Sequence, residues 1–138
     1  MIQYRFHSKV GCMKRVLIVD DDIDLLDLVC LILQAANLSP KGIVTESELL
    51  PTLATEHFDL ILMDIYLGDT DGRQISRHLK TDDRYKEIPI LLYSAGDISP
   101  ASIDESLANA FLKKPFDMPV LINRINHLMD PGQVNRFN

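Results

Sequence analysis

The stretch RVLIVDDDIDLLDLVCLILQAA, residues 15–36, contains the first strand and the first helix expected of this chain. Arg15–Val19 is a brief, nearly continuous apolar run, which is typical of a parallel strand covered on both faces. Three aspartates follow it, and Ile23–Ala36 then repeats apolar residues at helical spacing. The residues expected on the face toward the sheet are Leu25, Leu28, Val29, Ile32 and Ala36. The stretch is typical of the opening of a βαβ unit.

The same alternation of short apolar runs and helical segments continues along the chain. Further strands are predicted at Gly42–Val44 with its flanks, Asp59–Met63, Pro89–Tyr93 and Ala110–Lys113. Further helices are predicted at Ser47–Glu56, which Pro51 should shorten, at Asp71–Lys80, from an N-cap at Ser99 followed by Pro100, and at Asp117–Met129. We therefore expect an α/β fold, a doubly wound five-stranded parallel sheet with helices on both faces.

This domain is expected to occupy residues 14–130, between an N-terminal extension (residues 1–13) and a polar tail (residues 131–138). The extension has no apolar core followed by a cleavage site, and no apolar stretch approaches the roughly 18 residues of a membrane span. The chain is thus expected to be cytoplasmic, without membrane contact.

The charge and cysteine content exclude several other classes of protein. Fourteen Lys and Arg residues stand against twenty Asp and Glu, a net charge of −6, without a basic run. Direct binding of nucleic acid is therefore not expected. Cys12 and Cys30 have neither metal-ligand spacing nor the number required for a disulfide framework.

Polar side chains that can carry chemistry stand at the ends of the predicted strands. They are Asp20, Asp21 and Asp22 after the first strand, Asp64 after the third, Ser94 after the fourth, and Lys114 with Pro115 after the fifth. Ligands of open parallel sheets bind beyond the carboxyl ends of the strands, so these residues should converge on one site.

The chemistry of this set indicates a magnesium-dependent phosphoryl site. Carboxylates brought together repel unless a cation compensates them, and Mg²⁺ prefers carboxylate and phosphate oxygens. Lys114 and Ser94 supply a positive charge and a hydroxyl for a phosphoryl group. Asp64, alone on its strand end, is a better candidate for the nucleophile than any member of the crowded Asp20–Asp22 group, where Asp22 also suits a helix cap.

At these positions the chain resembles the response-regulator receiver domain of two-component signalling. The motifs that carry the resemblance are VLIVDDDIDLLDLV at Val16–Val29, DLILMDIYLGDTDG at Asp59–Gly72, IPILLYSAG at Ile88–Gly96 and FLKKPF at Phe111–Phe116. The resemblance covers about Lys14 to Asp130. Each motif alone is weak, but four in order on successive strand ends are specific. The resemblance implies a flavodoxin-like receiver fold with strand order 2-1-3-4-5.

The resemblance also implies a role for each site residue. Asp64 would be the phosphoacceptor, Ser94 would contact the phosphoryl group and Lys114 would pair with it. The metal site for Mg²⁺ would consist of Asp20, Asp21 (the preferred direct ligand), Asp64 and the backbone carbonyl of Tyr66. Phe111 occupies the aromatic switch position, although a plain core role fits it equally well.

The expected function is that of a phosphoacceptor response regulator which catalyses only its own phosphorylation and dephosphorylation. Its donor would be a sensor histidine kinase or a phosphotransfer protein. Its output would pass through contact with a downstream protein, because no effector module is expected in a stand-alone receiver domain.

The loop after Asp64 departs from the family pattern. Leu67-Gly68-Asp69-Thr70 replaces the usual proline-containing turn, and we expect Gly68 to make the turn through its conformational freedom. Tyr66 and Gly96 lie beside the expected path of the hydrolytic water, and we expect them to adjust the lifetime of the phosphoryl group.

Two alternatives remain open at this point. A small haloacid-dehalogenase-type phosphatase would use Asp20 as nucleophile and Asp22 as acid/base, although Asp24 departs from its signature and Asp64 has no role in it. A receiver-like adaptor would act independently of phosphate, although the intact acidic set argues against it.

Overall fold

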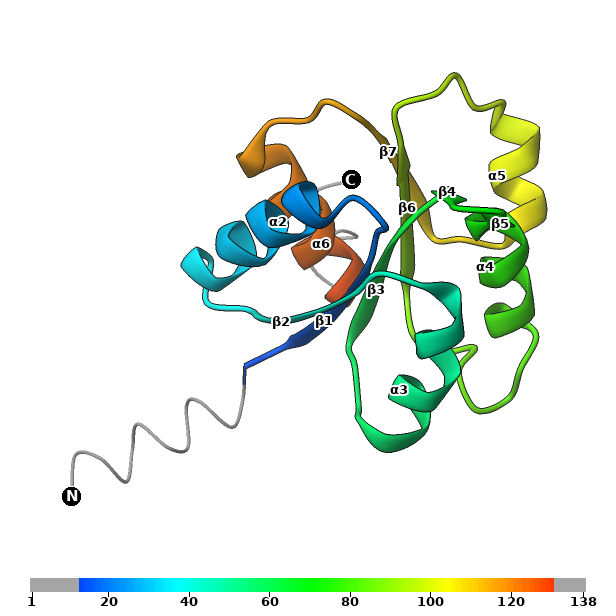
Figure 1. Ribbon diagram of the computed structural model, residues 1–138, viewed down its shortest axis with the longest axis horizontal. Coiled ribbons are helices and arrows are strands. Elements are labelled where there is room, and N and C mark those ends of the chain that lie inside the picture. Colours follow the sequence, from blue (N-terminus) through cyan, green and yellow to red (C-terminus); the bar gives the residue numbers. More distant parts are fainter. Residues whose placement is uncertain (1–12, 131–138) are drawn as a thin grey trace.

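The computed structural model describes residues 13–130, and its core is a parallel sheet between two layers of helices (Figure 1). The predicted extension, apart from Met13, and the predicted tail lie outside the described residues. The strands of the sheet are β1 (Arg15–Val19), β2 (Ser39–Ile43), β3 (Leu60–Asp64), β6 (Ile90–Ser94) and β7 (Ala110–Lys113). Their spatial order is β2-β1-β3-β6-β7, with every pair parallel. Counted along the chain within this sheet, that is the predicted order 2-1-3-4-5.

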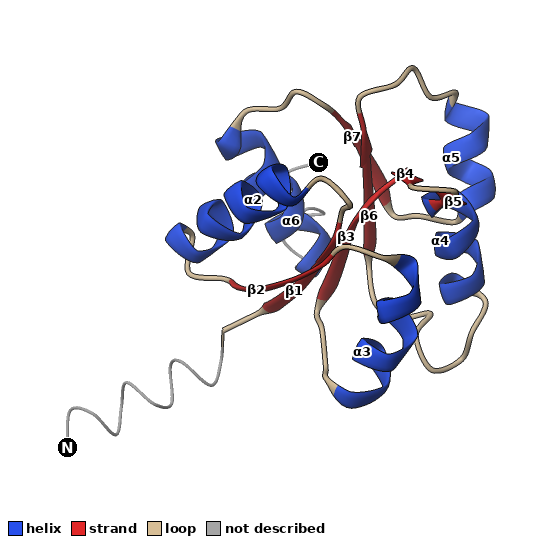
Figure 2. Cartoon of the chain, in the orientation of Figure 1, coloured by secondary structure: helices blue, strands red, loops and turns tan. Residues whose placement is uncertain are grey.

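The helices cover both faces of the sheet, as the α/β prediction requires (Figure 2). They are α2 (Ile23–Ala35), α3 (Leu49–Thr55), α4 (Gly72–Lys80), α5 (Pro100–Ser106) and α6 (Met118–Met129), with a 3₁₀ turn η1 (Glu46–Glu48). Strand side chains alternate between the faces, so β1 packs Val16 and Ile18 with α2 and α6, and Leu17 and Val19 with α3 and α4. The core therefore consists of two apolar layers separated by the sheet.

Most helix boundaries follow the predicted caps. Asp71 and Ser99 accept hydrogen bonds from the first turns of α4 and α5, and Pro100 opens α5. The segment predicted as one helix over Ser47–Glu56 is divided into η1 and α3, with Pro51 in the first turn of α3, where its missing N–H costs nothing.

The predicted second strand, Gly42–Val44 with its flanks, overlaps the observed strand, but its centre was set too far along the chain. The strand begins at Ser39, includes Pro40 and ends at Ile43. It lies at the edge of the sheet, where proline is tolerated and a continuous apolar run is not required, so its sequence carries a weak strand signal.

The predicted buried face of α2 was also wrong in part. The residues that are buried are Leu26, Val29 and Leu33, whereas Leu28 is 52% exposed. The helix is rich in leucine on more than one side, so apolar spacing alone could not fix its rotation about the axis. Leu28 and its neighbours instead line a surface beside the site described below.

Within residues 13–130, no helix combines the length and the apolar character needed to cross a membrane.

Candidate functional site

Side chains from three strand ends meet at the carboxyl edge of the sheet. The Lys114 ammonium Nζ lies 2.8 Å from Oδ2 of Asp64 and 3.3 Å from Oδ2 of Asp20. Asp20 follows β1, Asp64 ends β3 and Lys114 follows β7. The parallel register therefore brings together residues separated by 50 and 94 positions in the chain.

Asp64 is nearly buried, with 7% of its surface exposed. Burial raises the pKa of its carboxyl group, while the Lys114 ammonium and the backbone N–H of Tyr66 oppose that rise. The Tyr66 N–H donates to Oδ1 at 3.0 Å and Lys114 contacts Oδ2. Both carboxylate oxygens are therefore oriented, and their charge is partly compensated.

The three consecutive aspartates have three different environments. Asp20 is fully buried, and its Oδ1 accepts the N–H of Asp22 at 2.9 Å. Asp21 is exposed, and its Oδ2 accepts the N–H of Gly68 at 3.0 Å. Asp22 caps α2 by accepting the N–H of Leu25. A capping carboxylate is poorly placed to act as the acid/base of a phosphatase.

Asp20, Asp21 and Asp64 form a group that fits a divalent cation. One carboxylate oxygen from each lies within 4.8 Å of the others. Carboxylates with open space for water and phosphate oxygens are the ligands that Mg²⁺ takes in proteins. The predicted acidic set is therefore assembled as a possible metal site.

The loop after Asp64 forms a small antiparallel hairpin of β4 (Tyr66–Leu67) and β5 (Thr70–Asp71). Gly68 makes its turn with φ of +58°, as expected from the sequence. Tyr66 is 54% exposed, and its ring lies against Gly96, where an added Cβ would be 3.3 Å from the ring. The two residues predicted to border the path of water are thus neighbours.

The structure places the two predicted switch residues at different depths. Ser94 is fully buried at the end of β6; its hydroxyl accepts the N–H of Gly96, and its carbonyl accepts the N–H of Lys114 at 2.8 Å. Phe111 lies further back in β7, half-buried against the core layer of α4 and α5. Lys113 is exposed and pairs with Asp97.

Tyr93, the residue before Ser94, was not among the predicted site residues. Its side chain is fully buried, its hydroxyl donates to Oδ2 of Asp20 at 2.5 Å, and Lys114 Nζ lies 4.3 Å from the centre of its ring. Burial and the Asp20 carboxylate raise its pKa far above the usual value, so the hydroxyl stays protonated. The available signal was a phenol inside an apolar strand, because a buried tyrosine hydroxyl requires a partner.

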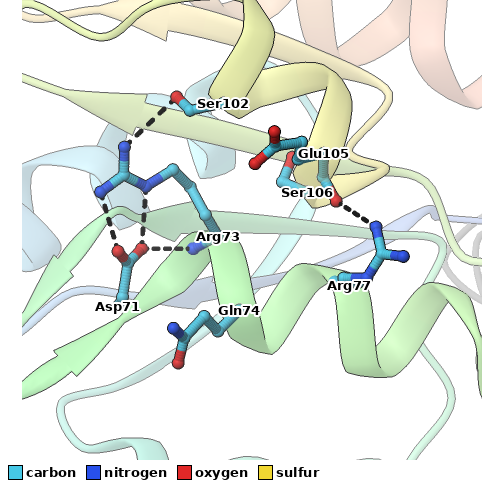
Figure 3. Close-up of a pocket in the computed structure, with 7 residues that line it drawn as sticks. All are labelled: Asp71, Arg73, Gln74, Arg77, Ser102, Glu105 and Ser106. Carbon is cyan, nitrogen blue, oxygen red and sulfur yellow. Dashed lines mark hydrogen bonds and ion pairs between the residues drawn. The ribbon is translucent and has the colours of Figure 1, made fainter.

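Two of the cavities that lie outside this acidic group border α2, α4 and α5. A polar cleft of about 300 Å³ separates α4 from α5, where Arg73 joins Asp71 to Ser102 and Arg77 bonds the carbonyl of Glu105 (Figure 3). These bonds tie the two helices together. A mainly apolar cavity of about 430 Å³ lies between α2 and the segment after β7, and it includes Leu28, Phe116 and Met118 beside Lys114.

Comparison with known sequences settles the family. A family model described as "Response regulator receiver domain" matches residues 16–126. The chain belongs to the response regulator receiver family. Receiver domains act in two-component signalling, and they are generally not catalytic enzymes. The family match favours a receiver domain over the phosphatase alternative. The capping role of Asp22 agrees with this, because the phosphatase would need Asp22 as its acid/base.

Individual relatives agree with this assignment. The chain is 32% identical over 116 residues to the CAI-1 autoinducer sensor kinase/phosphatase CqsS of Vibrio cholerae, covering 81% of this chain and 17% of that protein. It is also 32% identical over 119 residues to the DNA-binding dual master transcriptional regulator RpaA of Synechocystis, covering 85% and 49%. The chain therefore spans less than half the length of either relative.

Solved receiver structures have the same fold. The Vibrio cholerae chemotaxis protein CheY4 superposes with a TM-score of 0.78 at 27% identity, covering 85% of this chain and 99% of that one. The receiver fold predicted from the four motifs is confirmed.

Proposed function

We propose that this receiver domain accepts a phosphoryl group on Asp64 in a Mg²⁺-dependent reaction, and that phosphorylation changes its contacts with a downstream protein. The observation that carries the proposal is the position of Asp64, 2.8 Å from the Lys114 ammonium and grouped with Asp20 and Asp21. A phosphoacceptor carboxylate needs this combination of a fixed nucleophile, a cation for the arriving oxygens and a place for a divalent metal.

The reaction is an in-line displacement at phosphorus. An oxygen of the Asp64 carboxylate forms a new bond to phosphorus, and the bond from phosphorus to the donor breaks with its electron pair left on the donor. Lys114 compensates negative charge on the phosphoryl oxygens, and the Ser94 hydroxyl donates a hydrogen bond to one of them. Hydrolysis of the acyl phosphate later restores Asp64.

The carboxylates of Asp20, Asp21 and Asp64, with the carbonyl of Tyr66, would hold Mg²⁺. When bound, the ion neutralises charge that builds up between the carboxylates and the phosphoryl oxygens. The Tyr66 N–H bond to Asp64 supports this assignment, because it fixes the Tyr66 backbone beside the acceptor.

The proposed donor is a phosphohistidine on a sensor histidine kinase or a phosphotransfer protein. Apolar side chains of α2 and the first turn of α6 are exposed beside the site, including Leu28 at 52% and Met118 at 57%. Together with the adjoining apolar cavity, they offer a surface that a protein donor can cover while its phosphohistidine reaches Asp64.

For the output, we propose that phosphorylation draws the Ser94 hydroxyl toward the phosphoryl group and turns the Phe111 ring inward. Because Phe111 is half-buried against the layer of α4 and α5, its movement would alter the surface around α5, β7 and α6. This is a local change of charge that biases a two-state element.

The test is phosphorylation of the wild-type protein and of Asp64→Asn by acetyl phosphate with and without Mg²⁺. Intact-mass and peptide mass spectrometry locate the phosphoryl group. We expect a Mg²⁺-dependent adduct on Asp64 that is absent from the variant. An adduct on Asp20 would contradict the assignment of the nucleophile, and no adduct from acetyl phosphate or histidine donors would favour the phosphate-independent adaptor.

A further inference from the structure

Tyr93 contacts two of the groups that the proposed reaction uses. It pairs with Asp64 in the register of β3 and β6, so its backbone lies beside the acceptor. Its hydroxyl donates to Oδ2 of Asp20, and the face of its ring lies below the Lys114 ammonium, 4.3 Å from ring centre to Nζ. One buried side chain therefore orients a carboxylate through its hydroxyl and a cation through its ring.

The hydroxyl matters because Asp20 is fully buried and needs donors for both of its oxygens. Oδ1 has the N–H of Asp22, whereas Oδ2 has the hydroxyl of Tyr93 and the more distant ammonium of Lys114. Without the hydroxyl, Oδ2 would depend on Lys114 alone. The orientation of the Asp20 carboxylate would then be less well fixed.

The ring matters because the carboxylates of Asp20 and Asp64 both attract the Lys114 ammonium. Its Nζ is closer to Asp64, at 2.8 Å, than to Asp20, at 3.3 Å. Contact with the ring face limits the positions that the flexible lysine chain can take. The lysine is thus held where it can reach a phosphoryl group on Asp64.

We propose that Tyr93 is a positioning residue: its hydroxyl holds Asp20 in the orientation that serves the metal, and its ring holds Lys114 toward Asp64. The inference rests on the proposed function, since it assigns Tyr93 to the same site. The hydroxyl and the ring of Tyr93 thus have separate roles, and different substitutions can remove the hydroxyl alone or the hydroxyl and the ring together.

The first experiment compares the wild-type protein with Tyr93→Phe, which loses only the hydroxyl, and Tyr93→Leu, which loses the hydroxyl and the ring. Calorimetric titration with Mg²⁺ alone measures metal affinity. We expect Tyr93→Phe to weaken Mg²⁺ binding about tenfold, the usual effect of removing a partner that orients a metal ligand. Tyr85→Phe is the matched control, because Tyr85 is also buried but lies in the opposite core layer.

The second experiment measures the initial rate of acetyl phosphate labelling over a range of Mg²⁺ concentrations. For Tyr93→Phe, the Mg²⁺ concentration at half-maximal rate should rise by a larger factor than the maximal rate falls. Tyr93→Leu should in addition lower the maximal rate severalfold, because Lys114 is no longer held. A general loss of structure would lower the maximal rate of both variants together.

A double-mutant cycle tests whether Tyr93 acts through Asp20. In an Asp20→Asn background, Tyr93→Phe should leave the Mg²⁺ affinity unchanged, because the oriented carboxylate is already absent. Equal Mg²⁺ affinity of Tyr93→Phe and wild type, or a full tenfold effect in the Asp20→Asn background, would overturn the inference. Wild-type protein that binds Mg²⁺ but is not labelled on Asp64 would contradict the proposed function alone.

Discussion

The contact between Tyr66 and Gly96 gives a prediction about the lifetime of the phosphoryl group. The exposed Tyr66 ring lies against Gly96, and we propose that it covers part of the approach to Asp64. Replacing it with a smaller polar side chain in Tyr66→Asn should open this approach to water. We expect severalfold faster phosphate release from Tyr66→Asn, measured after the donor is removed. Equal rates for the two proteins would show that Tyr66 does not control the access of water.

Gly72 gives a prediction about stability at the same loop. A Cβ at this position would lie 2.3 Å from the carbonyl oxygen of Asp64, because the Gly72 N–H bonds closely to the carbonyl of Ile65. Gly72→Ala should therefore destabilise the fold by about 2 kcal/mol or more, measured by urea unfolding.

Gly68→Ala is the matched control for Gly72→Ala. Gly68 has a positive φ, but a Cβ there would have no atom within 4 Å. Only backbone strain is introduced, about 1 kcal/mol. An equal loss of stability in both variants would mean that the close approach at Gly72 is not what requires glycine.

At the scale of elements, the end of α5 contains a strained residue. Leu107 terminates the helix in the left-handed conformation, with φ of 62°, where glycine is favoured. We expect Leu107→Gly to be more stable than Leu107→Ala by about 1 kcal/mol, since both remove the leucine side chain and only glycine relieves the strain. Thermal or urea unfolding of the two variants measures the difference. Equal stabilities would mean that the left-handed conformation is not strained there.

The strands were predicted well where both faces of a strand are covered. In β1, β3 and β6 the apolar run and the buried strand coincide to within a residue, because burial on both sides requires continuous apolar sequence. β2 lies at the edge and does not need a continuous apolar sequence. Because Pro40 and Lys41 are not typical strand residues, its start could not be recognised from the sequence. The rotation of α2 depended on packing against the sheet, which leucine spacing does not encode.

The site was predictable to the extent that sheet topology determines it. Asp20, Asp64 and Lys114 lie at or just after the ends of strands that share one edge of the sheet, so the sequence predicts their proximity. The hydroxyl bond of Tyr93 depends on the side-chain direction within β6 and on the depth of Asp20. Neither property is visible in a run of apolar letters.

At the scale of the whole molecule, the proposed metal site couples ion binding to folding. Asp20, Asp21 and Asp64 are brought together only in the folded chain, so Mg²⁺ should bind the native state and raise its stability. At a concentration 100-fold above the dissociation constant, the gain is about 2.7 kcal/mol. Thermal unfolding with increasing Mg²⁺ measures it.

Two substitutions check the origin of this stabilisation. Asp21→Asn removes a proposed ligand, so its melting temperature should respond less to Mg²⁺. Asp83→Asn removes an exposed carboxylate that pairs with Lys86, away from the site, and should respond like the wild type. A rise in melting temperature that is the same in all three proteins would indicate general ionic effects in place of a specific site.

The division of the core into two layers has a consequence for how such a protein can evolve. In residues 13–130, the sheet lies between the apolar layer under α2 and α6 and the layer under α3, α4 and α5. Under the proposed function, α6 borders both surfaces, whereas α2 borders only the surface offered to the donor and α5 only the surface that changes on phosphorylation. After gene duplication, one copy can therefore acquire a new donor through substitutions on α2 and keep its old target, so the links of a signalling network can change one at a time.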